Sequence, residues 1–490
     1  MIALLVLMPA LAGVAAFFMK PDPPRRIMLV SVAIAQAALS VITWAVPPAA
    51  ALGGWLYEDA VGRLFLTVTS LLFLAASIYA VPYLREERGG THADFEEGFL
   101  FSNAREASFT GCLLLFLAAM TLVALSQHLG LLWVAVEATT LASAPLIYFH
   151  RHHRSLEATW KYLLICSVGI ALALLGIFFL AVSATNPDAP VVSLVLPDLL
   201  TASPHLNGPW LKAAFVLLLV GYGTKMGLAP LHTWLPDAHS EAPSVASALL
   251  SGALLNCAFL GILRTHQICV ASGLADFSGR LLVGFGLLSM GVAAVFVTGQ
   301  TDYKRMLAYS SVEHMGVLAV GIGLGGAGIF GAMLHVVNHS LTKAMLFMVA
   351  GNLLAVYRTK NTTQVSGALR LVPASGVLWV LGFLAITGSP PFGPFLSEFA
   401  ILKSALDQGR SLVAITYLLL LGVILAGMAG PALSMAQGTP PANVSVPARR
   451  GLALRAVPAV LGAAVLMMGV YVPPVLSRTL HEAARLLGQG

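Results

Sequence analysis

Apolar residues form long continuous runs along this chain, and short polar segments separate them. A helix that crosses a bilayer needs about 20 mostly apolar residues. The pattern therefore predicts about fourteen membrane-spanning helices, near residues 1–19, 27–46, 62–84, 108–126, 129–149, 158–183, 210–231, 244–271, 276–299, 304–325, 327–357, 373–406, 411–436 and 452–476. The longest polar stretch, residues 85–106, is too short to bury a core, so no soluble domain is predicted. The first apolar run lacks a basic start and a convincing cleavage site, so we predict a span there, not a signal peptide.

The composition agrees with a membrane protein and argues against several functions. Of 490 residues, 58% are hydrophobic and only 10% are charged, which excludes a soluble globular protein. The four cysteines lie in apolar segments without metal-ligand spacing, so we expect small buried side chains. Because there is no CxxC motif and no glycine-rich nucleotide loop, we expect no cofactor here. Any redox chemistry is expected in other subunits.

Basic residues are distributed unequally between the two sets of loops. Cytoplasmic loops of membrane proteins are rich in Lys and Arg. Loops after odd-numbered predicted helices carry 17 of the 27 basic residues, including Arg88, Arg449 and Arg450, and the opposite loops carry 7. This distribution predicts that both termini lie outside the cytoplasm. Three lysines are left over, within predicted spans: Lys225, Lys343 and Lys403.

Lys225 interrupts a long apolar run and is surrounded by Gly221, Gly223, Gly227 and Pro230. A charge inside the bilayer costs at least a few kcal/mol and usually has a function. A broken helix at membrane depth is tolerated where it lines a protein-enclosed or hydrated cavity. These features predict an ion path. Lys403 is a weaker candidate, because it is close enough to a helix end to extend its amine to the membrane surface.

Acids and histidines also fall within predicted spans. Glu137, Glu313 and Glu398 do so, and His335, His339 and Lys343 follow at four-residue spacing, hence on one helix face. A zinc site is an alternative, but the segment lacks a third ligand nearby and the Glu of HExxH. A structural hydrogen-bonded pair of histidines stays open as well.

The spacing of breaks and charged residues predicts an internal repeat. Gly and Pro interrupt a second span, TGSPPFGPFLSEF, just before Glu398. Glu398 follows Lys225 by 173 residues, and Glu313 follows Glu137 by 176. Paired broken helices in two halves of a transporter point to its ion site. We expect units of five helices, and the odd number inverts the second relative to the first.

Three motifs resemble a known family: GTKMGLAPLHTWLPDAHSEAPSVASALLSG, TDYKRMLAYSSVEHMG and HVVNHSLTKAMLFMVAGN. They are similar to the antiporter-like membrane subunits of respiratory complex I, of multisubunit sodium/proton antiporters and of membrane-bound nickel–iron (NiFe) hydrogenases, including formate hydrogenlyases. The versions SSVEHMG and PPFGPFLSEFAILK look most like component F of the hydrogenase-4 type.

The resemblance implies an all-α membrane protein of fourteen helices with two inverted five-helix repeats, each holding half of a proton channel. The implied segments are residues 1–107, a first repeat at 108–271, a second at 276–436 and a C-terminal helix and tail at 437–490. The implied proton relay comprises Glu137, Lys225, His335, His339, Lys343 and Glu398. Supporting residues are expected at His232, Asp237, Glu241, Asn256, Asp302, Lys304, Glu313, His314 and Lys403.

One position departs from the family pattern. Where many relatives carry a lysine in the eighth helix, this chain has Asn256. A neutral amide cannot relay a proton as a charged switch does. The link between the halves is then expected to rest on water, on Asn256 as a hydrogen bonder, or on His266 if it lies deep enough.

The predicted mechanism starts from an ion pair between Glu137 and Lys225. If the glutamate is neutralised or withdrawn, Lys225 loses its partner and releases a proton toward the second half. Histidines suit the next steps because their unperturbed pKa is near neutral, and Glu398 hands the proton to the outer side. The alternative is that the charges only hold helices together.

The sequence thus predicts a proton-translocating subunit, without a redox site of its own, of a hydrogenase-type or NADH-quinone oxidoreductase-like complex in the bacterial inner membrane. Expected partners are other membrane subunits and, through them, a peripheral arm with nickel–iron or quinone/iron–sulfur subunits. The alternatives are a subunit of a stand-alone sodium/proton antiporter and an energy-coupling subunit for inorganic carbon uptake.

Overall fold

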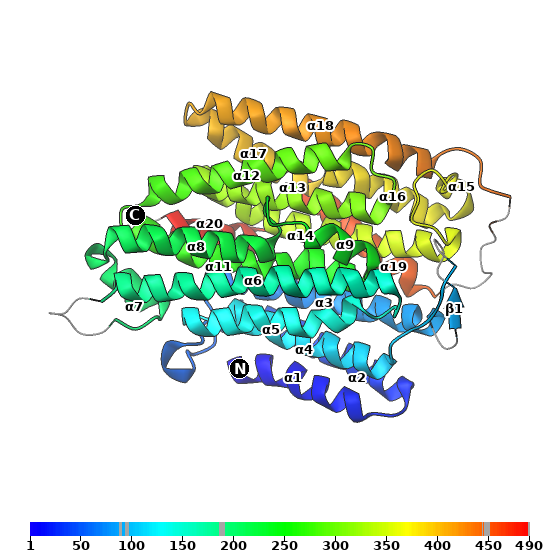
Figure 1. Ribbon diagram of the computed structural model, residues 1–490, viewed down its shortest axis with the longest axis horizontal. Coiled ribbons are helices and arrows are strands. Elements are labelled where there is room, and N and C mark those ends of the chain that lie inside the picture. The colour runs from blue at the N-terminus through cyan, green and yellow to red at the C-terminus, as the bar shows by residue number, and fades with distance from the viewer. Residues whose placement is uncertain (88–90, 94–97, 186–191, 443, 445–450, 489–490) are drawn as a thin grey trace.

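Helices follow the predicted apolar runs in the computed structural model, which describes the chain except for residues 88–90, 94–97, 186–191, 443, 445–450 and 489–490. Arg88, Arg449 and Arg450, used above for orientation, lie outside the described residues. The long helices run side by side along the longest axis of the bundle (Figure 1). They are α1 (Ile2–Phe18), α2 (Asp22–Ile42), α3 (Ala60–Glu86), α4 (Glu106–Leu125), α5 (Leu129–Ile147), α6 (His153–Ser183), α8 (Gly208–Met226), α11 (Leu255–Ala271), α12 (Ala275–Val297), α13 (Tyr303–Leu324), α14 (Ala327–Tyr357), α16 (Pro373–Ile386), α17 (Gly393–Asp407), α18 (Ser411–Ala436) and α19 (Ala453–Val470).

Shorter elements connect or cap these helices. The short α-helices are α7 (Leu196–Ala202), α9 (Trp234–Glu241), α10 (Ser244–Leu249), α15 (Ala368–Leu371) and α20 (Pro474–Gly488). Two 3-10 turns, Leu52–Gly54 and Ser203–His205, and one π-helical turn, Leu250–Leu254, complete the helical set. Strands β1 (Thr91–Ala93) and β2 (Leu100–Ser102) form an antiparallel pair.

The prediction of an all-α polytopic membrane protein is confirmed. Among the described residues, eleven helices are long and apolar enough to cross a membrane, with α10, the π turn and α11 counted as one. The remaining predicted spans correspond to the shorter helix α1 and to two interrupted helices, α8 with α9 and α16 with α17. The predicted breaks are therefore present in both halves.

Glycine and local hydrogen bonds shape the first break. Gly227 ends α8 in the left-handed conformation, with φ of 87°, which costs glycine little. The indole of Trp234 donates to the Thr224 carbonyl at 2.8 Å, and the Ala229 amide donates to the Ser289 hydroxyl at 2.9 Å. These bonds satisfy backbone groups that an interrupted helix leaves unpaired inside a membrane.

The second break separates α16 from α17 and brings a turn against an acid. Gly388, with φ of 65°, lies so close to the Glu398 carboxylate that a Cβ there would collide with it. The side-chain amide of Asn338, on α14, donates to the Gly393 carbonyl at 2.7 Å. The break therefore positions the start of α17, and Glu398 with it, against α14.

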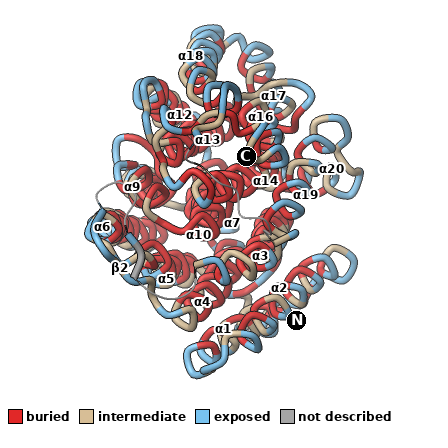
Figure 2. Tube along the Cα trace, turned by 90° about the vertical axis from the view of Figure 1, so that its right-hand side faces the viewer, coloured by how far each residue is buried: buried red, intermediate tan, exposed pale blue. Residues whose placement is uncertain are grey.

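Burial is uneven across the bundle. Figure 2 shows buried residues concentrated around α10, α13 and α14, and exposed ones on outlying helices such as α2 and α18. The most apolar windows of α13 and of the α10–α11 span are completely buried, whereas only 22% of that of α18 is buried. Polar side chains on these central helices are therefore shielded from lipid by other helices.

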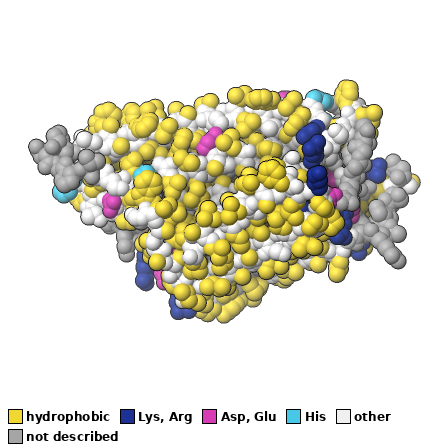
Figure 3. All heavy atoms as spheres, turned by 90° about the horizontal axis from the view of Figure 1, so that it is seen from below, with side chains coloured by type: hydrophobic (Ala, Val, Ile, Leu, Met, Phe, Trp, Pro, Cys, Tyr) yellow, Lys and Arg dark blue, Asp and Glu magenta, His cyan; other side chains and the backbone are white. Residues whose placement is uncertain are grey.

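The two ends of the bundle differ from its middle. Hydrophobic side chains cover most of the middle of the face in Figure 3, and basic side chains gather toward the ends. We call the end that carries Arg154, Lys304, Arg305 and Lys360 the basic end. Strand β2 lies there too, because Phe101 lines the same cavity as Lys304 and Lys360.

Candidate functional site

Lys225 lies in the last turn of α8, directly before the first break, and is completely buried. Its amine donates hydrogen bonds to the hydroxyls of Thr140 on α5 and of Tyr162 on α6, the latter at 2.8 Å. The amine also lies 4.7 Å from the centroid of the Tyr162 ring, a cation–π distance. The lysine is thus held at the meeting point of three helices of the first half.

Glu137 does not pair directly with Lys225, so the predicted ion pair is wrong. No ion pair between their charged atoms occurs within 4.0 Å, although both side chains are described. Thr140, one turn after Glu137 on α5, donates its hydroxyl proton to the carboxylate at 3.0 Å and accepts from Lys225. Ser167, on α6, donates to the other carboxylate oxygen at 3.2 Å. The acid and the lysine are therefore connected through one hydroxyl.

The stripe on α14 is present in the second half. His335, His339 and Lys343 are all completely buried. The Lys343 amine donates to the Leu307 carbonyl at 2.6 Å and to the Ser310 hydroxyl. Both acceptors belong to α13, so the lysine is held between two central helices.

His314 connects the stripe to the second break. Its Nδ1 lies 2.9 Å from Nε2 of His335 and 3.8 Å from a carboxylate oxygen of Glu398. Nδ1 of His335 lies 2.9 Å from the Ser397 hydroxyl. The His339 ring lies 5.2 Å from the His314 ring. Helices α13, α14 and α17 thus bring four titratable side chains together.

The structure supplies the third zinc ligand that the local sequence lacks. One ligand atom each of His314, His335 and Glu398 lies within 4.8 Å of the others. Two nitrogens on a tetrahedral zinc ion would be about 3.3 Å apart, given bonds of about 2.0–2.1 Å. The 2.9 Å between the two imidazoles is a hydrogen-bond distance. The observed geometry therefore favours a proton-conducting contact.

Several buried polar atoms of this cluster have no hydrogen-bond partner in the part of the chain that the structure describes. They are Oε2 of Glu313, Nε2 of His314, both ring nitrogens of His339 and Oε1 of Glu398. Buried polar atoms are rarely unpaired and are commonly satisfied by water. The unpaired atoms of His339 and Glu313 can therefore bind internal water, which a proton path requires.

Helix α11 separates the two clusters and contacts both. The Asn256 amide donates to the Ser340 hydroxyl on α14 at 2.8 Å and to the Gly252 carbonyl at 2.9 Å. Helix α11 also packs against α8, which carries Lys225. His266 lies elsewhere, in a cavity with Gly323 and Leu487 near the end of α13. Asn256, and not His266, is thus placed to connect the halves.

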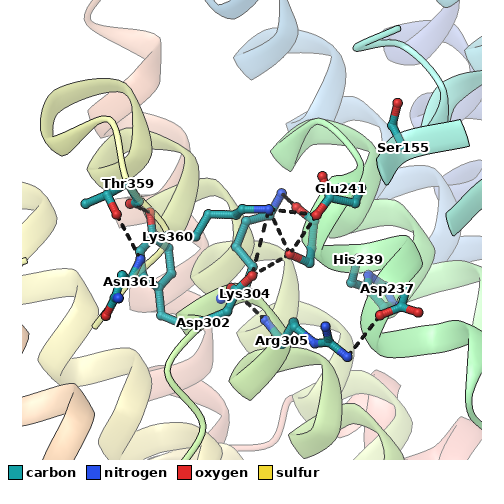
Figure 4. Close-up of polar contacts among 12 residues, drawn as sticks. Ser155, Asp237, His239, Glu241, Asp302, Lys304, Arg305, Thr359, Lys360 and Asn361 are labelled. Atoms are coloured by element: carbon teal, nitrogen blue, oxygen red, sulfur yellow. Dashed lines mark hydrogen bonds and ion pairs between the residues drawn. The ribbon is translucent and has the colours of Figure 1, made fainter. Parts of the chain in front are cut away.

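A charged network closes the basic end, as Figure 4 shows. The Lys360 amine lies 2.7 Å from Glu241 and donates to Ser240 at 3.1 Å, while Ser240 donates to Asp302 at 2.5 Å. Burial opposes ionisation of Glu241, but the charge and hydrogen bond of Lys360, together with the charges of Arg154 and Lys304, outweigh it and lower the pKa of Glu241 to about 2. We call Ser240, Glu241, Asp302, Lys304 and Lys360 the basic-end network.

The other supporting residues lie around this network. Asp302 caps α13 by accepting from the Lys304 and Arg305 amides at 2.7 and 3.1 Å. Asp237 pairs with Arg305 at 3.0 Å and with Lys161 at 2.9 Å. His232 is buried in the first break, 6.3 Å from the Tyr309 ring.

Lys403 stands apart from every buried cluster. It is exposed near the end of α17 and pairs with Asp407, one turn later. This position agrees with the alternative that Lys403 extends its amine toward the membrane surface. We leave it out of the candidate relay.

Sequence reasoning missed the hydroxyl residues and one histidine. Thr140, Tyr162, Ser310 and Ser397 contact the charged groups directly. His239, in the LPDAHSEAP motif, is completely buried beside Phe347. Thr140 and Ser397 had a detectable signal, because each lies within one helical turn of a predicted acid.

Buried lysines, histidines and acids on interrupted membrane helices define a polytopic membrane protein of the ion-translocating class. The chain belongs to the family described as NADH:quinone oxidoreductase/Mrp antiporter, transmembrane, which matches residues 126–425. This assignment confirms the resemblance drawn from the motifs.

Two kinds of relatives support the assignment. A hydrogenase-4 component F homologue from Methylacidiphilum infernorum is 36% identical over 364 residues, which cover 74% of this chain and 75% of that protein. A chain of an archaeal membrane-bound sulfane sulfur reductase is similar with a TM-score of 0.87 and 20% identity, over 100% of this chain and 98% of that one. A chain of the Mrp complex from Dietzia sp. has a TM-score of 0.84 and 21% identity, over 99% and 97%. The two structures establish the fold.

Proposed function

We propose that this chain moves protons across the membrane as a subunit of a respiratory oxidoreductase complex of the hydrogenase-4 or NADH-quinone type. The observation that carries the proposal is a series of buried titratable side chains, from Lys225 to Lys343, His339, His314 and Glu398. A charged side chain that only holds two helices together needs one hydrogen-bonding or ion-pair partner. This series instead contains unpaired nitrogens and oxygens at several successive positions.

The two breaks divide the path into halves. Residues 108–271 would form the first half, with Glu137 and Lys225, and residues 276–436 the second, with Lys343 and Glu398. Residues 1–107 and 437–490 would flank them. The packing supports this division, because α6 lies on α8 as α14 lies on α17.

The basic end would face the cytoplasm of a bacterium, with the chain in the inner membrane. Arg154, Lys304, Arg305 and Lys360 lie at this end, and cytoplasmic segments are rich in basic residues. The end of α1 lies there too, because Lys20 lines a cavity with Asn103 and Glu106. The N-terminus is then outside the cytoplasm, and the C-terminus is proposed to be there as well.

The first step would be a change of charge at Glu137. With Glu137 ionised, Thr140 directs its proton to the carboxylate and its lone pairs to Lys225, which favours the ammonium form. Neutralising Glu137 removes this orientation and the nearby negative charge, so Lys225 releases its proton. The proton would cross near Asn256, pass Lys343 and the histidines, and leave through Glu398.

The energy would come from partner subunits. Similarity to a hydrogenase-4 component F homologue supports neighbouring membrane subunits and, through them, a peripheral arm that carries the redox chemistry. Moving one charge against 100 mV requires about 2.3 kcal/mol, which this chain would receive through its contacts with those subunits.

The test uses the assembled complex in sealed vesicles, with electron transfer and proton uptake measured together. Lys225→Ala should abolish proton movement, and Lys225→Arg should impair it strongly because arginine holds its proton too tightly. Lys212→Ala is the matched control, since Lys212 is an exposed lysine on the same helix. Full pumping by Lys225→Ala would refute the proposal.

A stand-alone sodium/proton antiporter is the second candidate, because the Mrp complex shares the fold along nearly the whole chain. Purification distinguishes the two. Redox subunits in the same particle would support the oxidoreductase. A particle without redox centres, in which proton flux depends on sodium, would support the antiporter.

A further inference from the structure

His239 is a buried histidine that the relay above does not use. It lies on the short helix α9, directly after the first break, and is completely buried. Its ring stacks on Phe347 of α14, with centroids 5.1 Å apart and planes 18° apart. Neither ring nitrogen has a hydrogen-bond partner among the described residues. The side chain therefore packs by its face and leaves both polar edges unsatisfied.

Unpaired buried nitrogens need an explanation. A buried donor or acceptor without a partner costs about 1–3 kcal/mol, and a neutral imidazole has one of each. Ordered water is the usual remedy. The arrangement of His239 thus indicates water on both edges of the ring.

The ring lies between two lysines. On one side, the Lys304 amine donates to the carbonyls of Ser240 and Ala242, which flank the end of α9, at 2.9 and 2.6 Å. On the other side, Phe347 is one turn from Lys343 on α14. Figure 4 shows His239, on α9, beside the network that contains Lys304.

Lys304 and the group that binds Lys343 lie close together on α13. The Leu307 carbonyl, which binds Lys343, is one turn after Lys304 on α13. At a rise of 1.5 Å per residue, these two positions are about 4.5 Å apart along the helix axis. Lys304 and the carbonyl that Lys343 binds therefore lie within one turn of α13, against which α9, the helix of His239, packs.

Solvent reaches the outer side of the network. A cavity of about 490 Å³ is lined by Arg154, Glu241, Asp302 and Lys360, and a smaller one of about 130 Å³ includes Lys304. A proton from the aqueous phase can therefore approach Lys304 without crossing the first half.

We propose that His239 carries protons from the basic-end network to Lys343, so that the second half takes up a proton of its own in each cycle, a step that proton movement requires together with proton release from Lys225. A proton from water on the network side binds one ring nitrogen. The proton on the other nitrogen leaves, through water, to the neutral amine of Lys343. After the transfer, the imidazole carries its proton on the other nitrogen. Rotation of the ring then returns it to the starting orientation. This inference rests on the proposed function.

The experiment compares His239→Gln with His266→Gln in the assembled complex in sealed vesicles. Glutamine keeps polar edges but cannot pass a proton. His266 is also buried with an unpaired nitrogen, but it lies away from the relay. We expect proton movement to fall by about two orders of magnitude or more in His239→Gln, the loss typical of removing a proton-transferring side chain, and to persist in His266→Gln.

A rescue experiment separates proton transfer from packing. His239→Ala leaves a space beside Phe347, and added free imidazole should restore proton movement while an equal concentration of pyrrole should not. Full pumping by His239→Gln, or equal restoration by pyrrole, would overturn the inference while leaving the proposed function intact. Absence of proton movement in the unmodified complex would instead overturn both.

Discussion

Asn256 and Ser340 join the two halves of the protein through a 2.8 Å hydrogen bond from the side-chain amide to the hydroxyl. Asn256 belongs to α11, and Ser340 follows His339 on α14. Because α11 also packs against α8, the helix of Lys225, this helix adjoins both clusters. A neutral contact therefore occupies the place where the family resemblance implies a lysine.

Asn256→Leu should slow proton transfer between the halves while leaving the fold intact, because leucine has a similar volume but no amide. Ser340→Ala should have a similar effect. The double variant should be no slower than the worse single variant, since both remove the same contact. Proton movement per electron in vesicles is the measurement, and fully additive losses would show that the two residues act separately.

Thr140→Val should uncouple Glu137 from Lys225. Valine matches threonine in shape but has no hydroxyl, so the carboxylate loses a donor and the ammonium an acceptor. We expect proton movement to fall at least tenfold, a loss that corresponds to about 1.4 kcal/mol. Thr140→Ser retains the hydroxyl and should retain most activity. Unchanged pumping by Thr140→Val would show that the acid acts on the lysine by another route.

Arg264 and Asp59 form a buried pair away from the relay and should matter for stability only. Arg264 is completely buried, and its guanidinium contacts both Asp59 oxygens, one at 2.8 Å. Asp59→Asn leaves a buried charge uncompensated, which typically costs about 3–5 kcal/mol. Thermal unfolding in detergent should show a lower midpoint, whereas the proton-to-electron ratio of correctly assembled complex should not change.

The ion pair between Glu241 and Lys360 should set the acid sensitivity of the basic end. The pKa of Glu241 is lowered from 4.5 to about 2 because Lys360, with the charges of Arg154 and Lys304, outweighs the effect of burial, which alone would raise it. Its stabilisation, on the order of 3 kcal/mol, is therefore fully present above about pH 4.5 and is lost as the pH falls toward 2.

The stability difference between the native chain and Glu241→Gln measures this effect. It should stay constant between pH 7 and 5 and shrink only below about pH 4.5. A difference that disappears between pH 7 and 5 would contradict the assignment, because it would require a raised pKa.

Lys403→Ala should leave proton movement unchanged, in contrast to Lys343→Ala. The Lys403 amine pairs on the surface with Asp407, and exposed pairs of this type contribute well under 1 kcal/mol. Lys343 is completely buried between α13 and α14. Proton movement by the two variants, measured in parallel in vesicles, would decide which lysines belong to the relay. A loss of proton movement in Lys403→Ala would show that Lys403 belongs to it.

Apolar run length and Gly/Pro punctuation were enough to predict the helices, because a membrane restricts a spanning chain to few structures. The breaks at Gly227 and Gly388 were likewise predictable from composition. The residues that contact Lys225 could not be predicted. Hydroxyl residues such as Tyr162 are common in apolar helices, and they carry no charge that would single them out in the sequence.

The site was therefore predicted as a set of residues and not as a set of contacts. Helical periodicity placed His335, His339 and Lys343 on one face, as observed. It could not show that Thr140 would come between Glu137 and Lys225, because that depends on how α5 packs against α8. His239 was missed because a histidine within a loop-like motif gives no sign that it will be buried.

The π turn at Leu250–Leu254 determines where Asn256 points. A π turn holds one residue more than an α-helical turn, so the helix beyond it is rotated by about 100° relative to an uninterrupted α-helix. If this turn regained α-helical pairing, Asn256 would rotate away from Ser340. A return to the π-helical pairing would restore the hydrogen bond between them. A backbone register change within five residues is thus sufficient to open or close the junction between the halves.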